Sequence, residues 1–332
     1  MVKLIAYHVS DEEAQIIRQW TESTGMNVKM IEDELTVETV HLAQGFDGIT
    51  NGQVSNVDSR VYPILQEYGI PVIGQRSAGF EMYELDEARK HGVTITNVPS
   101  YSPESIAEFT VFAILRQLRN ISQIDQRVSE QNFTWEPVIR SRPLNKLTVA
   151  VVGVGRIGSR VANILKNGFG ARVLAYDIQE RDEFRTLVDY QRDLLSAVKD
   201  ADIITIHMPA TADNYHQFNQ ELFAQLKEGV IIINAARGRI INTDDLLEAL
   251  DSGQVHSAAL DVYEYEGPYM PKNWTGREIE DPVFKKLLDH PQIYYTPHIA
   301  YYTDEAVKNL VEGGLNSALE VIQTGQARNQ VN

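Results

Sequence analysis

The segment Leu147–Gly158 constrains the fold of this chain most strongly, because a β-forming run leads straight into three glycines spaced G-x-G-x-x-G. Gly153 permits a tight turn, Gly155 lets the backbone approach a pyrophosphate, and Gly158 lets the following helix lie close to the strand. Helical residues follow, so the amides at the helix N-terminus would face an anion. The segment therefore predicts the first strand, turn and helix of a dinucleotide-binding domain.

The next expected strand supports this prediction and indicates which dinucleotide binds. It begins at Arg172 and ends in Asp177, nineteen residues after Gly158. An acidic side chain at this point can accept hydrogen bonds from the hydroxyl groups of the adenosine ribose. Because Asp177 would repel the 2′-phosphate of NADP and no arginine follows it directly, the pattern favours NAD. The expected cofactor contacts in this region and at later strand ends are Gly153, Gly155, Arg156, Ile157, Gly158, Asp177, His207, Pro209 and Ala235.

Strand-forming runs alternate with helical runs on both sides of a helix expected from Glu104 to Asn120, which follows a break at Pro99–Pro103. This alternation predicts an α/β fold with two doubly wound parallel sheets. A last helix, Asp304–Gln323, is expected to pack on the N-terminal domain. In the second series we expect six strands, the number in a full dinucleotide-binding sheet: Leu147–Gly153, Arg172–Asp177, Ala201–His207, Val230–Ala235, Val255–Asp261 and Ile293–Thr296.

Three ionisable side chains follow strands of the second series, at the sheet edge where open α/β sheets bind ligands. Arg237 can hold a carboxylate and polarise a ketone, His298 can deliver a proton, and Glu266 can orient the imidazolium and raise its pKa. Each residue alone has a structural interpretation: a surface ion pair for Arg237, a structural hydrogen bond for His298, and a solvated loop for Glu264 and Glu266. Their positions behind one cofactor motif favour keto-acid reduction.

The composition limits the partners and the cell compartment. The 332 residues include 30 basic and 46 acidic side chains, a formal charge of -16, and no cysteine. Such a surface should repel nucleic acid and anionic lipid, and a protein without thiols can have neither disulfides nor thiolate metal sites. We expect a cytoplasmic protein without a bound metal. An anionic substrate would need the few available cations, so arginines at strand ends, Arg76 and Arg237, are candidates.

Over essentially its whole length the sequence resembles the D-isomer-specific 2-hydroxyacid dehydrogenase family, in the branch of bacterial D-lactate and D-2-hydroxyisocaproate dehydrogenases. The resemblance implies a flavodoxin-like substrate domain from residues 1–101 and 300–332, with a Rossmann NAD-binding domain, residues 102–299, inserted between them. It also implies a homodimer through the cofactor domain. The segments that carry it are Asn97–Glu108, Val151–Gly158, Asn234–Gly238, Leu260–Glu266 and Thr296–Tyr302.

The resemblance also implies roles for individual residues. Arg237 matches the substrate-binding arginine, Glu266 the acid that pairs with histidine, and His298 the general acid/base. Asp261 matches the residue that hydrogen-bonds the nicotinamide carboxamide. The residues that match the family's substrate contacts are Ala78 and Gly79, whose amides receive the substrate carboxylate, and Tyr101 and Tyr301, which border the substrate side chain.

One departure from the family pattern concerns substrate size. The chain has Asn51-Gly52-Gln53 where lactate-specific relatives tend to carry an aromatic residue, so Gly52 suggests extra volume for 2-keto acids bulkier than pyruvate, such as 2-ketoisocaproate or phenylpyruvate. Two alternatives stay open from sequence: an NAD-responsive binding or regulatory protein of the same fold, and a dehydrogenase for glyoxylate or glycerate.

Overall fold

The computed structural model describes residues 2–332 and divides into two compact units. Unit 1 comprises the chain up to Ser102 together with Tyr302–Asn332, and unit 2 comprises Pro103–Tyr301. The expected boundaries, 101 and 300, differ from these by one and two residues. Both units are mixed α/β layers built on parallel strands, as the alternation of strands and helices predicts.

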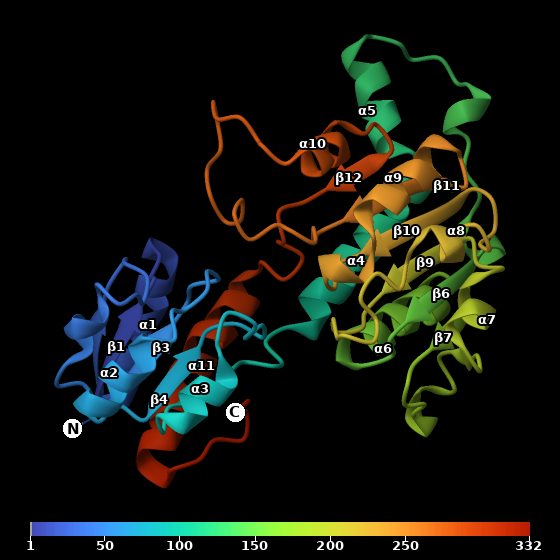
Figure 1. Ribbon diagram of the computed structural model, residues 1–332. Coiled ribbons are helices and arrows are strands. Elements are labelled where there is room, and N and C mark those ends of the chain that lie inside the picture. The colour runs from blue at the N-terminus through green and yellow to red at the C-terminus, as the bar shows by residue number, and fades with distance from the viewer. Residues whose placement is uncertain (1) are drawn as a thin grey trace. The chain divides into compact units, whose positions relative to one another are not determined.

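Unit 1 contains a five-stranded sheet in the order β2-β1-β3-β4-β5, with all pairs parallel. Figure 1 shows this sheet in the blue to cyan part of the chain. The order is that of flavodoxin-like folds. Its strands are β1 (Lys3–Tyr7), β2 (Asn27–Met30), β3 (Gly48–Asn51), β4 (Val72–Gln75) and β5 (Thr94–Thr96). Its helices are α1 (Asp11–Thr24), the short 3₁₀ helix η1 (Val40–Ala43), α2 (Val61–Tyr68), α3 (Leu85–Lys90) and α11 (Asp304–Thr324).

Helix α11 returns to the N-terminal sheet from the other end of the sequence. It shares a buried apolar cluster with β1 and α1, and the indole nitrogen of Trp20 donates to Asn316 Oδ1 at 2.9 Å. A side chain on Gly74 of β4 would overlap the Gly314 carbonyl, so helix and strand lie at backbone contact. The expectation that the last helix packs on the N-terminal domain is therefore confirmed.

Unit 2 contains a parallel sheet in the order β12-β11-β10-β9-β6-β7-β8, the dinucleotide-binding order with one strand more at the β12 edge. The sequence analysis predicted six of these strands, β12 included, and missed β8. The strand β8 has only two residues and no recognisable β pattern. The strands are β6 (Thr148–Val152), β7 (Arg172–Tyr176), β8 (Asp189–Tyr190), β9 (Ile203–Ile206), β10 (Val230–Asn234), β11 (Val255–Leu260) and β12 (Ile293–Tyr295).

Helices cover both faces of this sheet, so every residue of the central strands β9 and β10 is buried. The α-helices are α4 (Pro103–Leu118), α5 (Ile121–Ser129), α6 (Arg156–Asn163), α7 (Leu194–Val198), α8 (Gln220–Phe223), α9 (Thr243–Asp251) and α10 (Pro282–Asp289). The other helical turns are the 3₁₀ helices η2 (Pro137–Ile139), η3 (Leu144–Lys146), η5 (Asp182–Phe184) and η6 (Gly238–Ile240), and the π-helical turn η4 (Ile164–Gly168).

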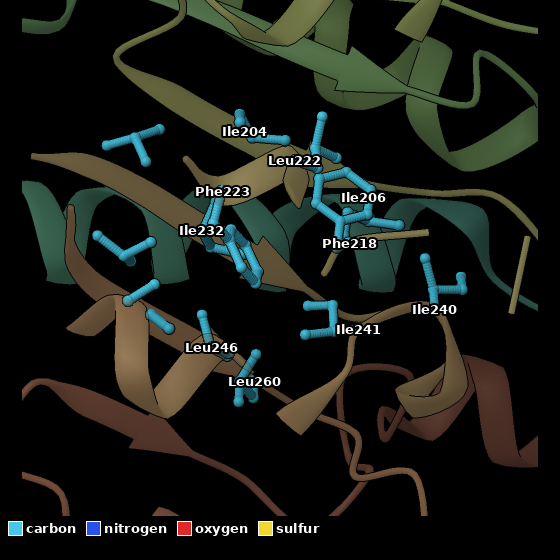
Figure 2. Packing of buried hydrophobic residues seen from close by; sticks show 14 of the residues in the cluster. Ile204, Ile206, Phe218, Leu222, Phe223, Ile232, Ile240, Ile241, Leu246 and Leu260 are labelled. Atoms are coloured by element: carbon cyan, nitrogen blue, oxygen red, sulfur yellow. The ribbon is translucent and has the colours of Figure 1, made fainter. Parts of the chain in front are cut away.

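The core on one face of the unit 2 sheet joins side chains of β9, β10 and β11 to those of the surrounding helices and loops. Figure 2 shows Ile204, Ile206 and Ile232 facing Phe218 and Phe223. Burying each such side chain stabilises the fold by about 1.5–3 kcal/mol. This apolar core fixes the strands, and it therefore also fixes the positions of the residues that follow their carboxyl ends.

Helix α4, expected over Glu104–Asn120, packs on the opposite face of the same sheet. It contacts α6, β10 and β11, and Gln117 Nε2 donates to the Ala258 carbonyl of β11 at 2.5 Å. Phe112 on its outer side stays 47% exposed. Among residues 2–332, no helix combines the length and the hydropathy that a bilayer crossing requires.

Candidate active site

The glycine-rich turn after β6 has the geometry that a pyrophosphate requires. Gly153 has φ +91°, and a Cβ there would lie 2.8 Å from the backbone of His207 and Met208 at the end of β9. A Cβ on Gly158 would overlap the carbonyl of Gly153, whereas the space beside Gly155, the N-cap of α6, is open. The turn therefore fits a dinucleotide at the N-terminus of α6, where Arg156 and Ile157 begin the helix.

Asp177, directly after β7, organises this turn. Its Oδ2 accepts the Val154 amide at 2.6 Å, and its Oδ1 accepts the Gln179 amide at 2.9 Å. A carboxylate offers about four acceptor positions, so two remain for ribose hydroxyls. The side chain expected to select NAD thus also holds the glycine turn in place.

His207 directly follows β9 and lies beside the glycine turn. Its amide donates to the Val152 carbonyl at 2.7 Å, and its Nε2 lies 2.9 Å from Thr205 Oγ1. Burial lowers the pKa of His207 to about 3, so the ring is neutral at physiological pH. Two further expected cofactor residues lie at neighbouring strand ends, Pro209 in the loop after β9 and Ala235 directly after β10.

His298 and Glu266 form a hydrogen-bonded ion pair after β12 and β11. His298 Nδ1 lies 2.7 Å from Glu266 Oε1, and the other carboxylate oxygen accepts the Tyr263 amide at 2.9 Å. Burial lowers the pKa of His298, but the hydrogen bond and charge of Glu266 outweigh it, so the pKa is raised overall. Because Nδ1 is engaged by Glu266, Nε2 is the ring nitrogen that could exchange a proton.

Asp261, directly after β11, fixes the loop that carries His298. Its Oδ1 accepts from the Thr296 hydroxyl at 2.5 Å and the Ile299 amide at 2.9 Å, and its Oδ2 accepts the Ala300 amide at 2.8 Å. Asp261 is 2% exposed, and burial raises the pKa of its carboxyl group. These contacts hold His298 at φ +57°, a conformation that costs a non-glycine residue about 1–2 kcal/mol. This structural role differs from the nicotinamide contact that the family resemblance implies, which stays a prediction.

Arg237 lies in the turn after β10. Asn234 Nδ2 donates to its carbonyl at 3.0 Å, and one guanidinium nitrogen donates to the Ala236 carbonyl at 2.8 Å. Its positive charge acts on His298 and opposes the rise of that residue's pKa. The structure therefore brings Arg237, Glu266 and His298 together at the carboxyl ends of β10, β11 and β12, in unit 2. Tyr301 belongs to the same unit, three residues beyond His298.

In unit 1 the loop after β4 presents the amides of Ala78 and Gly79 in fixed directions. The Val98 amide donates to the Ser77 carbonyl at 2.9 Å, and Asn97 Nδ2 donates to the Ala78 carbonyl at 2.7 Å. In a trans peptide the N–H points away from the C=O, so these two bonds set the direction of both following N–H groups. Tyr101 lies in the same unit, and its carbonyl accepts from Asn309 of α11 at 2.6 Å.

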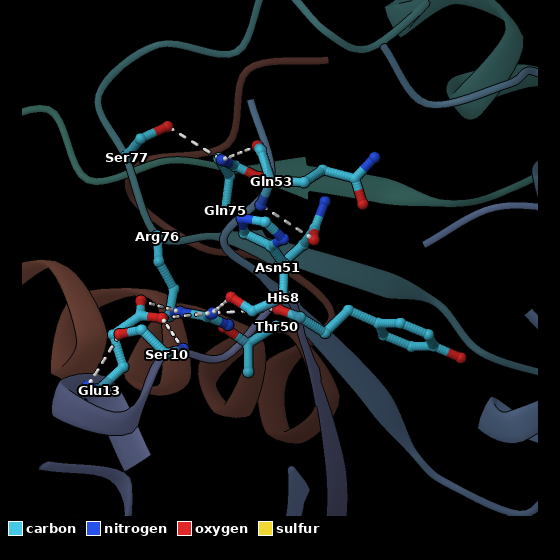
Figure 3. A network of polar contacts seen from close by, with 10 residues as sticks. His8, Ser10, Glu13, Thr50, Asn51, Gln53, Gln75, Arg76 and Ser77 are labelled. Carbon is cyan, nitrogen blue, oxygen red and sulfur yellow. Dashed lines mark hydrogen bonds and ion pairs between the residues drawn. The ribbon is translucent and has the colours of Figure 1, made fainter. Parts of the chain in front are cut away.

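Arg76, the other arginine at a strand end, is a structural residue. Figure 3 shows its guanidinium enclosed by Glu13 and by the backbone at the end of β1. Its Nε lies 2.8 Å from Glu13 Oε1, and a terminal nitrogen donates to the carbonyls of Tyr7 at 3.0 Å and His8 at 2.9 Å. With no exposed side-chain surface, Arg76 is not placed to bind a substrate anion.

The same guanidinium corrects the interpretation of Gly52. A Cβ on Gly52 would overlap the guanidinium of Arg76 and lie 2.9 Å from the His8 carbonyl. The missing side chain therefore leaves no empty volume beside the backbone, because Arg76 fills it. The glycine is explained by this close approach, and the argument for bulkier substrates loses its premise.

Residues 111–300 match the family model described as D-isomer specific 2-hydroxyacid dehydrogenase, NAD binding domain. The chain belongs to this family. It is 51% identical over 331 residues to a D-lactate dehydrogenase of Streptococcus pyogenes serotype M1, and 43% identical over 332 residues to one of Staphylococcus aureus strain MRSA252, each match covering 100% of both chains.

Solved structures agree over the same length. A D-lactate dehydrogenase from Treponema pallidum superimposes with a TM-score of 0.92 at 35% identity, covering 100% of both chains. A D-isomer specific 2-hydroxyacid dehydrogenase from Lactobacillus delbrueckii ssp. bulgaricus, in its NAD complexed form, gives 0.90 at 33% identity, also over 100% of both chains. The chain is therefore an NAD-dependent oxidoreductase with the Rossmann fold of these enzymes.

One pair of residues near the site escaped the sequence analysis. Glu264, which sequence could not distinguish from a solvated loop acid, has a side chain only 5% exposed, and its Oε2 lies 2.7 Å from His216 Nε2. The two residues are separated by 48 positions, so only the fold reveals the pair. No group of three His, Cys, Asp or Glu side chains within residues 2–332 is arranged to hold a metal ion.

Proposed function

We propose that this enzyme reduces pyruvate to D-lactate with NADH, using Arg237, Glu266 and His298. The observation that carries the proposal is the convergence of these three residues at successive strand ends, with the 2.7 Å contact between His298 and Glu266. The names of the relatives support pyruvate as the substrate. The proposed cofactor contacts are Gly153, Gly155, Arg156, Ile157, Gly158, Asp177, His207, Pro209, Ala235 and Asp261.

The bound cofactor supplies the hydride, and the protein supplies position, charge and the proton. Reduction adds a hydride to the keto carbon and a proton to the keto oxygen, so one acidic hydrogen must be available in the site. His298 holds that proton on Nε2 while Nδ1 donates to Glu266. The raised pKa of His298 keeps the proton available near neutral pH.

Substrate binding requires cations and fixed donors for a carboxylate. Arg237 supplies a guanidinium, whose planar fork matches a carboxylate and can also polarise the ketone. In unit 1 the directed amides of Ala78 and Gly79 are the proposed carboxylate donors. Tyr101 and Tyr301 are the proposed neighbours of the substrate side chain.

Loss of NADH absorbance on pyruvate, 2-ketoisocaproate, phenylpyruvate and glyoxylate tests the proposal, with His298→Ala measured alongside. Removing a general acid costs about 10²–10⁴-fold in kcat. His290→Ala is the matched control, because its ring lies before β12, at the amino end of the strand. We expect pyruvate to be preferred and only His298→Ala to be inactive. NADH binding without turnover on any keto acid would favour a binding protein instead, and preference for glyoxylate would indicate the other dehydrogenase class.

We also propose a homodimer formed through unit 2. Helix α5 has no buried residue, and the loop after it exposes Phe133 by 72% and Trp135 by 97%. Large exposed aromatic side chains are typical of association surfaces. Light scattering should give twice the chain mass for the wild type and a lower mass for Trp135→Arg; an unchanged mass would place the interface elsewhere. A cytoplasmic location stays a prediction from composition.

A further inference from the structure

The turn Tyr263–Glu266 carries two histidine–glutamate pairs that differ in which ring nitrogen they use. Glu266 holds Nδ1 of His298 at 2.7 Å and leaves Nε2 for chemistry. Glu264, two residues earlier, holds Nε2 of His216 at 2.7 Å. Both pairs lie in unit 2, and the turn is the segment that they share.

The second pair has both ring nitrogens of His216 engaged by the protein. The Oδ1 of Asn242 accepts the Asp245 amide at 3.1 Å, so its NH₂ group faces Nδ1 of His216, 3.4 Å away. Nδ1 is then the acceptor, and the proton on Nε2 is donated to Glu264. The ring is also stacked on Tyr215, with centroids 3.9 Å apart. With no nitrogen left for a substrate, this pair has no place in proton transfer.

The contacts of the pair join the turn of Glu266 to the turn of Arg237. The His216 amide donates to the Arg239 carbonyl at 2.9 Å, two residues after Arg237. Glu264 Oε1 accepts the Thr243 amide at 3.2 Å, at the first residue of α9. One bond from each partner, together with the contact between His216 and Glu264, therefore ties Arg239 and Thr243 to the turn after β11.

Backbone packing reinforces this connection at the same place. A Cβ on Gly238 would overlap the backbone of Tyr263 and Glu264. The residue directly after Arg237 thus touches the residue that anchors the second pair. A shift of either turn would be transmitted to the other, because neither backbone has room to move past its neighbour.

From these contacts we infer that His216 and Glu264 are positioning residues, which set the distance between Arg237 and Glu266 and so align His298. The inference rests on the proposed function. In the reaction a misplacement of about 1 Å can cost about 10²-fold in rate, so the pair matters to turnover without touching substrate.

Two conservative variants test the role. Glu264→Gln keeps the side-chain volume but presents an amide in place of a carboxylate to His216. His216→Asn introduces a residue type that tolerates the observed φ of +50° at this position. We expect each to lower kcat about 10- to 100-fold while NADH affinity stays at the wild-type value, because the glycine turn is untouched. His290→Asn is the control: His290 also pairs with a carboxylate, Asp251 at 3.5 Å, but before β12.

The pH profile separates positioning from general structural damage. The charged groups that act on His298 are Glu266, Asp261 and Arg237. If the second pair aligns Glu266, the alkaline limb of kcat/KM for reduction moves to lower pH in both variants. Adding Glu266→Gln to Glu264→Gln should then cost less than the sum of the single effects.

Contrary outcomes are distinct. If His298→Ala is inactive but the folded variants keep the wild-type kcat, the positioning role is overturned. It is also overturned if kcat falls while the alkaline limb does not move and the effects of the two substitutions add. Full turnover by His298→Ala would overturn the proposed function and the positioning role together.

Discussion

The two parallel sheets place an arginine at a strand end in contrasting surroundings. In unit 1, Arg76 follows β4, pairs with Glu13 and donates hydrogen bonds to backbone carbonyls. In unit 2, Arg237 follows β10 and lies near enough to His298 to affect its pKa. A charge at the carboxyl end of a strand therefore does not identify a site by itself. What distinguishes the two is the group on which each charge acts: the Arg76 guanidinium lies against the Glu13 carboxylate, and the Arg237 charge acts on His298.

The carboxylates of the two sheet edges differ in the same way. Burial raises the pKa of Glu13, but the Arg76 guanidinium outweighs it, and the pKa lies below its ordinary value. Glu13 also closes a capping box with Ser10 at the start of α1. Glu266 instead raises the pKa of His298, the proposed proton donor. Glu13 therefore stabilises the fold of unit 1, whereas Glu266 sets the protonation state of His298.

The largest expected effect is that of Arg237→Lys on activity. Lysine cannot reproduce the planar fork, so we expect kcat/KM for pyruvate to fall about 10²–10³-fold. The melting temperature should stay at the wild-type value. Steady-state kinetics and a thermal melt together check this, and a large loss of stability would make Arg237 structural like Arg76.

The same substitution in unit 1, Arg76→Lys, should affect stability instead. A lysine cannot serve Glu13 and both the Tyr7 and His8 carbonyls, so buried acceptors lose their donors. We expect a loss of about 2–4 kcal/mol in the free energy of unfolding, measured by urea titration. Kinetics of the folded fraction should match the wild type; a specific loss of pyruvate affinity would instead make Arg76 a substrate residue.

A smaller effect is expected from Gly52→Ala. The added Cβ forces the Arg76 guanidinium to shift, which should cost about 1–3 kcal/mol of stability. The ratio of kcat/KM for phenylpyruvate to that for pyruvate should not change, because the position holds no free volume. A marked fall in that ratio would restore Gly52 as a determinant of substrate size.

Glu266→Gln should change the pH dependence. The raised pKa of His298 keeps the reactive proton present below that pKa and loses it as pH rises through it. Without the Glu266 charge the pKa falls, so the alkaline limb of kcat/KM for reduction should move to lower pH. An unmoved limb in a pH series would assign that limb to another group.

Several features of the fold were predicted from local sequence because they depend on neighbours along the chain. Helix α1, Asp11–Thr24, is of this kind, since its capping residues and apolar spacing lie close together in the sequence. The glycine spacing at Gly153 and Gly158 predicted the turn, and the structure gives both residues close backbone contacts. The two-residue strand β8 was missed, because its pairing with β7 is all that defines it.

The sequence by itself determined the α/β class, the dinucleotide motif and the family, because periodicity and motif spacing depend only on residues that are close together in the sequence. Only the tertiary structure shows which charged side chains are held by contacts within the fold and which lie at the proposed site. By residue type and position after a strand, Arg76 resembles Arg237 and Glu264 resembles Glu266, and only the family resemblance singles out Arg237 and Glu266. Their partners lie 63 positions away for Arg76, 48 for Glu264 and 32 for Glu266. A side chain's role depends on the acceptors and charges around it, and these are assembled only when distant segments fold together.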